Sequence, residues 1–220
     1  MSKYDVLIFD LDGTIVDSFP DGLACCLRAA RKNDWPVSSE TIETIRENWG
    51  ISTDRLVQMC WPKNNWRIMQ TALNDFNMNA PPPPLFPDVA KTLASLSQGR
   101  YIFTGRLRNG TMPLLAHHGL TDMFNRIMTR SDVFATKPDP EGLEKLIVPL
   151  EYALGYKRSG MLLVGDGYYS DGECARAAGI DFLASAESEN VSRIFFRRKG
   201  ISDEWIIDRF SDLPAWLAAA

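Results

Sequence analysis

The stretch Asp5-Val6-Leu7-Ile8-Phe9-Asp10-Leu11-Asp12-Gly13-Thr14 decides the fold of this chain. Its apolar run from Val6 to Phe9 contains β-branched and aromatic residues, which predicts a short strand buried on both faces. Two carboxylates, Asp10 and Asp12, follow the strand, and Gly13 indicates that the chain turns there. Acids this close repel each other at the carboxyl end of a buried strand, unless a cation or phosphate chemistry accounts for them. A solvated Asp-Gly turn is the alternative interpretation when the motif is taken alone.

The composition is that of an ordinary globular protein. The 220 residues are 45% hydrophobic and 24% charged, which suffices for a large core with or without a smaller second domain. A formal net charge of −4 argues against a surface for nucleic acid or for an anionic membrane. The spacing of the four cysteines matches no zinc or redox motif, so we expect reduced thiols in a cytoplasmic protein. We also expect no secretory signal and no membrane-spanning run.

Helical spacing replaces the strand pattern after the first motif. Apolar residues recur with a helical period at Leu23, Leu27 and Ala30, and similar patterns predict three or four helices before residue 80. The proline-rich run 80–87 is a poor helix and a poor strand, which predicts a stiff return linker. We therefore predict a small helical domain at 17–87, inserted into a core formed by 1–16 and 88–220. A proline loop within a single rigid domain is the alternative.

Helix and strand patterns alternate from residue 88 onward. Short strands are predicted around 101–103, 126–128, 161–164 and 180–183, and helices at 112–118 and at 141–150, where Pro149 sets a limit. Residues 205–207 suggest an edge strand before a terminal helix that starts at Leu213, whereas 185–204 show no clear pattern. This alternation predicts an α/β fold with a doubly wound, Rossmann-like parallel sheet, into which the small α-helical domain is inserted.

The polar residues that follow the predicted strands should meet at one edge of the sheet, because ligands of open α/β sheets lie outside the carboxyl ends of the strands. Four carboxylates, one hydroxyl and one ammonium are expected there: Asp10, Asp12, Thr104, Lys137, Asp166 and Asp171. Such a set suits a hard divalent cation, most plausibly Mg²⁺, that holds a phosphate whose remaining charge is met by Lys137.

These motifs, in this order, resemble those of the haloacid dehalogenase superfamily. The matching stretches are Asp10-Leu11-Asp12-Gly13-Thr14, Thr104-Gly105, Lys137-Pro138-Asp139-Pro140, and Gly165-Asp166 with Asp171. The subgroup resembled has a helical cap inserted after the first motif and includes phosphoglycolate phosphatases and β-phosphoglucomutases. The resemblance covers nearly the whole chain, including the position and length of the cap.

The resemblance implies a role for each matching residue. Asp10 would be the nucleophile that forms an aspartyl-phosphate, and Asp12 would be the general acid and then the general base. The Asp10 carboxylate, the Asp12 backbone carbonyl and Asp166 would hold Mg²⁺. The remaining matches would bind the phosphoryl group (Thr104, Lys137) or lie near the metal or orient Lys137 (Asp171).

The sequence departs from the family pattern after the second motif. Gly105 and Arg106 follow Thr104 where many relatives have Asn or Ser, so the way in which this loop meets the substrate is left open. Arg106 or Arg108 could reach a second anionic group, and an exposed, solvated arginine is the alternative. The fourth motif has the GDxxxxD spacing, which is a variant within the superfamily.

The cap is expected to select the substrate. The loop around Arg46, Trp49, Gly50 and Ile51 is expected to face the phosphate site, although Trp49 fits the packed interior of the cap equally well. His117 and His118 lie outside the motifs and are expected to be surface or capping residues.

These inferences favour a Mg²⁺-dependent phosphatase that hydrolyses a small phosphorylated metabolite, similar to phosphoglycolate or a sugar phosphate. A phosphomutase is the first alternative, because the same aspartyl-phosphate can be passed to a sugar. A receiver-like signalling domain and a non-catalytic binding protein are remote alternatives. The expected partner is the metabolite alone, with no nucleic acid or membrane, in a monomer or homodimer.

Overall fold

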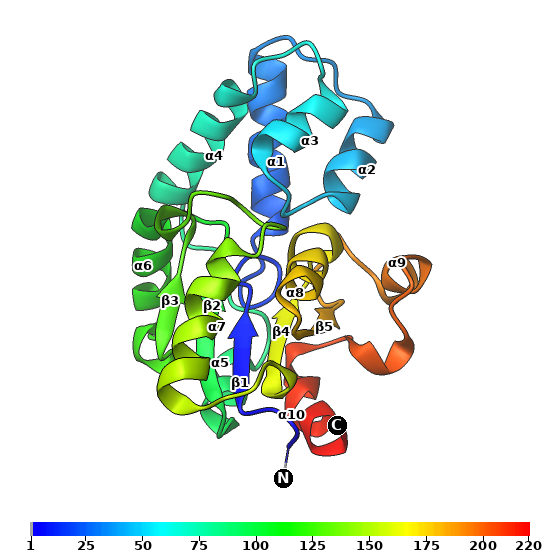
Figure 1. Ribbon diagram of the computed structural model, residues 1–220. Coiled ribbons are helices and arrows are strands. Elements are labelled where there is room, and N and C mark those ends of the chain that lie inside the picture. The colour runs from blue at the N-terminus through cyan, green and yellow to red at the C-terminus, as the bar shows by residue number, and fades with distance from the viewer. Residues whose placement is uncertain (1) are drawn as a thin grey trace.

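A six-stranded parallel sheet with strand order β3-β2-β1-β4-β5-β6 forms the core of the computed structural model, which describes residues 2–220 (Figure 1). The chain runs outward from β1 to β3 on one side and then returns to run from β4 to β6 on the other. This order places a topological switch point between β1 and β4, where open α/β sheets bind their ligands. The predicted doubly wound sheet is confirmed.

The strands are β1 (Val6–Phe9), β2 (Gly99–Phe103), β3 (Arg126–Met128), β4 (Met161–Gly165), β5 (Asp181–Ser185) and β6 (Ile206–Ile207). The α-helices are α1 (Phe19–Lys32), α2 (Ser39–Glu47), α3 (Thr53–Cys60), α4 (Trp66–Asn79), α5 (Val89–Ser95), α6 (Arg108–His117), α7 (Glu141–Leu154), α8 (Glu173–Ala178), α9 (Arg193–Arg198) and α10 (Leu213–Ala219). A π-helical turn, η4 (Tyr168–Gly172), precedes α8, and short 3-10 turns lie at Thr121–Met123, Arg130–Asp132, Arg158–Gly160, Asp203–Trp205 and Phe210–Asp212.

Both faces of the sheet are buried, as the apolar run of β1 predicts. Leu7 and Phe9 point into one core, which includes residues of α5, α6 and α10. Val6 and Ile8 point into the other core, which includes residues of α7 and α8. This two-sided packing fixes β1 in the middle of the sheet, so that Asp10 emerges at the centre of its carboxyl edge.

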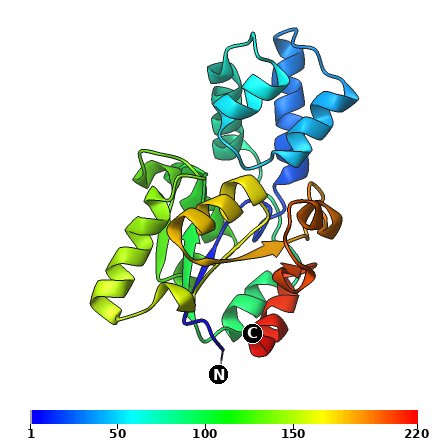
Figure 2. The same cartoon turned by 45° about the vertical axis from the view of Figure 1, so that its right-hand side comes forward.

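Helices α1 to α4 form a helical block, residues 19–79, above the carboxyl ends of the strands (Figures 1 and 2). Its own apolar cluster contains Trp35, Ile45, Val57, Trp61 and Met69. The two connections to the sheet lie next to each other: the Asp17 amide donates to the Pro84 carbonyl at 2.9 Å, and Val16 bridges Leu85 in antiparallel fashion. The predicted helical segment and its proline-rich return are therefore present. The division into domains at 17 and 87 stays a prediction.

Two predicted helix boundaries are wrong. Helix α7 continues through Pro149 to Leu154, because Arg126 Nη1 donates at 3.1 Å to the Lys145 carbonyl, the acceptor that a proline amide cannot serve. Helix α6 starts at Arg108 rather than at Met112, since the first-turn amide of Arg108 donates to Ser131 Oγ at 3.0 Å. Both partners come from distant segments, so the local sequence does not reveal them. Gly99 opens β2.

The segment without a clear pattern, 185–204, contains α9 and packs beside β5 and β6 through Phe196. Across residues 2–220, no helix is both long and apolar enough to span a membrane.

Candidate active site

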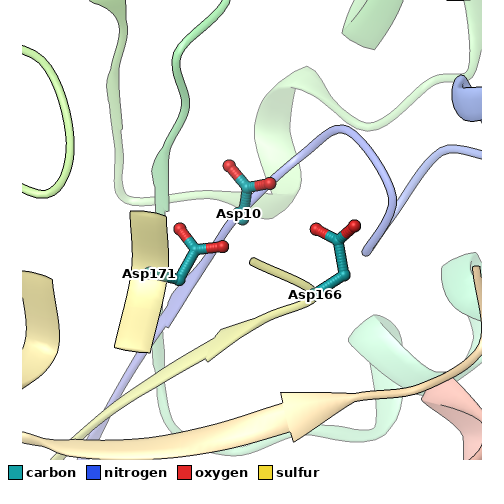
Figure 3. A group of neighbouring side chains, drawn as sticks. All are labelled: Asp10, Asp166 and Asp171. Carbon is teal, nitrogen blue, oxygen red and sulfur yellow. The ribbon is translucent and has the colours of Figure 1, made fainter. Parts of the chain in front are cut away.

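Three carboxylates gather at the switch point of the sheet (Figure 3). Asp10 follows β1, Asp166 follows β4, and Asp171 lies on η4. Each is buried, and one oxygen of each lies within 4.8 Å of the others. The predicted convergence of the first and fourth motifs is therefore present in the structure.

Lys137 connects two of these acids. Its Nζ donates to Asp10 Oδ1 and to Asp171 Oδ1, both at 2.6 Å. Burial alone would lower the pKa of Lys137, but the charges of Asp10 and Asp171 raise it above its usual value. The side chain is thus a buried ammonium, whose third hydrogen is left for another acceptor.

The acid cluster carries more negative charge than Lys137 can neutralise. Burial, with the nearby Asp171 and Asp12, raises the pKa of Asp10 to about 7 against the lowering effect of Lys137. Burial and the charges of Asp10 and Asp171 raise the pKa of Asp166 well above its usual value. Three crowded carboxylates supply the hard oxygen ligands that a divalent cation such as Mg²⁺ prefers, and a bound cation would favour their ionised form, so these residues fit the expected metal.

Gly13 lets the loop after β1 pass close to Asp166. Its φ is +83°, and a Cβ atom at this position would lie 2.2 Å from Asp166 Oδ2. Only glycine combines that backbone conformation with so close an approach. The DxDG turn is therefore packed directly against the fourth motif.

Asp12 is held by an arginine and lies to one side of the three-acid cluster. Arg106 donates from Nε to Asp12 Oδ2 at 3.1 Å and from Nη2 to Asp12 Oδ1 at 2.5 Å. Burial would raise the pKa of Asp12, but the charge and hydrogen bonds of Arg106 lower it below its usual value. The two acids of the first motif thus have opposite pKa shifts.

The wide spacing of the fourth motif is accommodated by the π-helical turn. The amides of Asp171 and Gly172 both donate to the Gly167 carbonyl, at 2.7 and 3.1 Å. Asp171 Oδ2 accepts the Gly167 amide at 3.0 Å, so that this carboxylate is bound on both oxygens. π-Turns of this kind occur often at functional sites.

Thr104 and Gly105 follow β2 as predicted. The Thr104 amide donates to the Met128 carbonyl at 3.0 Å, and Thr104 Oγ1 accepts the Arg106 amide at 3.1 Å. A Cβ atom on Gly105 would meet nothing within 4 Å, which leaves open space beside the threonine.

A cavity of about 650 Å³ lies between this edge of the sheet and the helical block. Its wall on the sheet side contains Asp10, Asp12, Thr104, Gly105, Arg106 and Lys137. The block contributes Trp49, Gly50 and Ile51, together with a face of α4 that carries Gln70, Asn74 and Asn77. The volume is in the range of small-molecule sites.

The loop after α2 lines the cavity through Trp49, Gly50 and Ile51. Trp49 lines it and also packs edge-to-face on Phe19 at 5.1 Å between ring centres, so this side chain contacts both the cavity and the interior of the helical block. Arg46 instead stacks over Phe19 and donates from Nη1 to the Glu189 carbonyl at 2.6 Å. His117 is exposed, and His118 follows the end of α6 with Nε2 at 2.8 Å from the Pro83 carbonyl.

Sequence reasoning missed two residues at the site. Asn190 is buried, and its Nδ2 lies 3.4 Å from Asp166 Oδ2. Ser18 lines the cavity, and its buried Oγ has no hydrogen-bond partner among residues 2–220. Asn190 lies in the segment without a periodic pattern, and Ser18 directly precedes α1, where a serine is expected as a helix-capping residue, so neither carried a signal.

Comparisons with known proteins agree with the fold and with the family that the motifs resemble. The family model for haloacid dehalogenase-like hydrolases matches residues 7–185. A phosphoglycolate phosphatase from Yersinia pestis is 30% identical over 182 residues, which are 78% of this chain and 76% of that protein. The prediction of a hydrolytic phosphatase is thereby confirmed at the level of enzyme class.

Solved structures share the architecture over nearly the whole chain. A haloacid dehalogenase-like hydrolase from Bacteroides fragilis has a TM-score of 0.79 at 23% identity, covering 96% of this chain and 99% of that one. The hydrolase YfnB from Bacillus subtilis, which was solved bound to magnesium and shows interdomain movement, has a TM-score of 0.64 at 18% identity, covering 98% and 99%. With the family match over residues 7–185, the chain belongs to the haloacid dehalogenase-like hydrolase family.

Proposed function

We propose that the protein is a Mg²⁺-dependent phosphatase that hydrolyses a small phosphorylated metabolite, similar to phosphoglycolate or a sugar phosphate, through an aspartyl-phosphate. One observation carries this proposal: the Asp10 carboxylate lies 2.6 Å from Lys137 Nζ and beside Asp166, at the switch point of the sheet. A nucleophilic carboxylate next to an ammonium and a cation site is an arrangement that can transfer a phosphoryl group through an aspartyl-phosphate.

The Asp10 and Asp166 carboxylates and the Asp12 backbone carbonyl would hold Mg²⁺. When bound, the ion would supply positive charge to the transferred phosphoryl group and reduce its repulsion from the carboxylates. Asn190 would keep the Asp166 carboxylate in position, as its contact with Oδ2 suggests.

Asp10 would attack phosphorus with Oδ2, which accepts no hydrogen bond from the described residues, while Oδ1 remains on Lys137. The bond between phosphorus and the ester oxygen breaks, and Asp12 gives a proton to the leaving alcohol. Asp12 then takes a proton from the water that attacks the aspartyl-phosphate, and phosphate leaves as the bond from Asp10 to phosphorus breaks. Asp12 gives this first proton from its carboxylic acid form, and the ion pair with Arg106 favours the carboxylate that remains, which is the form that the second step needs.

Thr104, Gly105 and Lys137 would bind the phosphoryl oxygens, because they line the same wall of the cavity as Asp10. Asp171 would orient Lys137, since one of its oxygens is on Nζ and the other on the Gly167 amide. Arg106 and Trp49 would meet the rest of the substrate.

The helical block and its two linkers, together residues 17–87, would act as a cap domain. It roofs the cavity through Trp49 and Gly50, and a Cβ atom on Gly50 would lie 3.2 Å from Ser170 Oγ on the core. A cap in such close contact would exclude bulk water during the first step and admit only substrates that fit.

Phosphatase activity is favoured over phosphomutase activity by the cap residues that line the cavity. None of those among residues 2–220 is a lysine or a histidine, so the block offers neither of these groups to direct the phosphoryl group to a sugar hydroxyl. The phosphoglycolate phosphatase relative supports the same choice.

A panel of phosphate esters tests the proposal. Purified protein should release inorganic phosphate from at least one small ester in the presence of Mg²⁺ and not after chelation, and Asp10→Asn should be inactive while its circular dichroism spectrum is unchanged. Isomerisation of glucose 1-phosphate without phosphate release would support the mutase instead. Equal activity in the wild type and in Asp10→Asn would refute the assigned nucleophile.

A further inference from the structure

We propose that Arg106 is a specificity-determining residue whose guanidinium binds a second negatively charged group on the leaving alcohol of the phosphate ester. This inference rests on the phosphatase function proposed above and assigns the recognition of that group to the core rather than to the cap.

Arg106 is held firmly in place. Its residue is 7% exposed, its amide donates to Thr104 Oγ1, and its carbonyl accepts the Arg130 amide at 3.0 Å. The side chain is fixed by the two hydrogen bonds to Asp12. A buried guanidinium that is rigid before the substrate arrives loses little conformational freedom on binding it.

The guanidinium still has donors to offer. It has five N–H groups, of which Asp12 takes one from Nε and one from Nη2. Nη1 donates to no acceptor among residues 2–220, and it is not among the buried atoms that lack a partner. One edge of Arg106 therefore holds Asp12, and donors remain for a ligand in the cavity that this residue lines.

The two buried cations of the site would divide their work. Lys137 lies against Asp10, the proposed nucleophile, and serves the transferred phosphoryl group. Arg106 lies against Asp12, the proposed proton donor to the ester oxygen, and so is next to the leaving alcohol. A carboxylate or phosphate one or two carbons from that oxygen would fall within reach of Arg106.

The opposite wall favours the same kind of group. Helix α4 lines the cavity with amide side chains at Gln70, Asn74 and Asn77, and the helical block adds a single acid to the lining, Asp54 of α3. Amides can donate hydrogen bonds to an anion without the repulsion that carboxylates would cause. The cavity lining thus combines the guanidinium of Arg106 with these neutral donors, whereas Arg130, which also lines the cavity, donates from Nη1 to the Val133 carbonyl at 2.8 Å.

Arg108, the other arginine of this loop, is occupied elsewhere. It is exposed and donates from Nη2 to Asp132 Oδ2 at 2.7 Å and to the Ile127 carbonyl at 3.1 Å, and it does not line the cavity. Of the two arginines that the sequence left open, the structure assigns the role to Arg106. Arg108 provides the matched control.

The test uses pairs of esters that differ only in the second charge: 2-phosphoglycolate against 2-hydroxyethyl phosphate, and 3-phosphoglycerate against glycerol 3-phosphate. For wild type, kcat/KM should favour the anionic member of at least one pair by roughly tenfold or more. Arg106→Gln should bring this ratio to about one, mainly through KM for the anionic member. Arg106→Lys, which keeps the charge, should retain part of the ratio, and Arg108→Gln should retain all of it.

The ratio separates specificity from a purely structural role. If Arg106 only positions Asp12, its replacement lowers kcat for both members of a pair equally, the ratio is unchanged, and the proposal is refuted. A wild-type ratio near one for both pairs refutes it as well. Circular dichroism checks that the variants fold.

Binding provides a readout that does not depend on turnover. If no ester is hydrolysed, the phosphatase function fails, but calorimetry of the same pairs with Asp10→Asn still tests Arg106. Tighter binding of an anionic member, abolished in the Asp10→Asn/Arg106→Gln double variant, supports the proposal. Equal affinities within both pairs overturn it.

Discussion

Lys137 Nζ and Asp171 Oδ1 are 2.6 Å apart in the interior, where the two side chains are 5% and 1% exposed. Asp171 in turn accepts the Gly167 amide on its other oxygen. The lysine next to the proposed nucleophile is thus anchored to η4, the turn that carries the last acid of the fourth motif. A change in this pair should affect both stability and phosphoryl transfer.

Lys137→Met should destabilise the protein by roughly 3–5 kcal/mol, because it leaves buried carboxylates without their cation. Urea unfolding in the absence of metal would measure this loss. Mg²⁺ should restore part of the stability of the variant, since the ion replaces some of the missing positive charge. Asp171→Asn should cost less, because Lys137 keeps its contact with Asp10; an equal or larger cost would contradict this account.

Without metal, the stability of the protein should fall as the pH rises from about 4 to about 7. The pKa of Asp10 is raised to about 7 in the folded state, against about 3.9 in an unfolded chain, and the pKa of Asp166 is also raised. Between these values the folded state binds more protons than the unfolded state, so the free energy of unfolding decreases with pH.

Thermal melts at pH 5 and pH 8, each with chelator and with Mg²⁺, would test this dependence. Mg²⁺ should raise Tm more at pH 8, where the acids are ionised and bind the cation without competition from protons. Asp166→Asn should reduce both the pH dependence and the effect of Mg²⁺. A stabilisation by Mg²⁺ that is independent of pH would argue against the acid cluster as its site.

Arg46→Ala should weaken closure of the cap and raise KM by several-fold, with a smaller effect on kcat. The reason is that Arg46 bridges the helical block and the core by donating to the Glu189 carbonyl at 2.6 Å. Glu189 is the neighbour of Asn190, whose side chain contacts Asp166. Steady-state kinetics on the preferred ester would measure the change. Arg31→Ala, at an exposed position in the last turn of α1, is the control and should leave KM unchanged.

Gly13→Ala should lower both activity and affinity for Mg²⁺. The added methyl group would require a strained backbone at φ +83° and would meet Asp166 Oδ2 at 2.2 Å, so the loop or the carboxylate has to move. Calorimetric titration with Mg²⁺ would detect the change. Wild-type affinity in this variant would show that the approach of Gly13 to Asp166 has no functional role.

The sequence was most informative where local signals and topology coincide. The apolar run of β1 and the acids after it placed Asp10 at the edge of the sheet, and the same rule placed Thr104 and Asp166 after their strands. Parallel strands align their carboxyl ends, so residues that follow different strands meet without any further information.

The sequence was least informative where a contact depends on two distant segments. The pairing of Arg106 with Asp12 joins residues 94 positions apart, and the contact of Asn190 with Asp166 joins residues 24 apart. Neither pair has a period or a spacing that a one-dimensional pattern could reveal. The passage of α7 through Pro149 escaped prediction for the same reason, since its compensating donor is on β3.

The two connections beneath the helical block run side by side where Val16 bridges Leu85. Because Val16 and Leu85 are neighbours, the chain leaves the sheet and returns to it at one place. The six polar side chains at the edge of the sheet all lie outside the residues between these two positions. A differently shaped lid could be grafted between these two positions without moving the reacting groups. We therefore expect exchange of the helical block to change which esters are accepted while the reacting groups on the sheet stay in place.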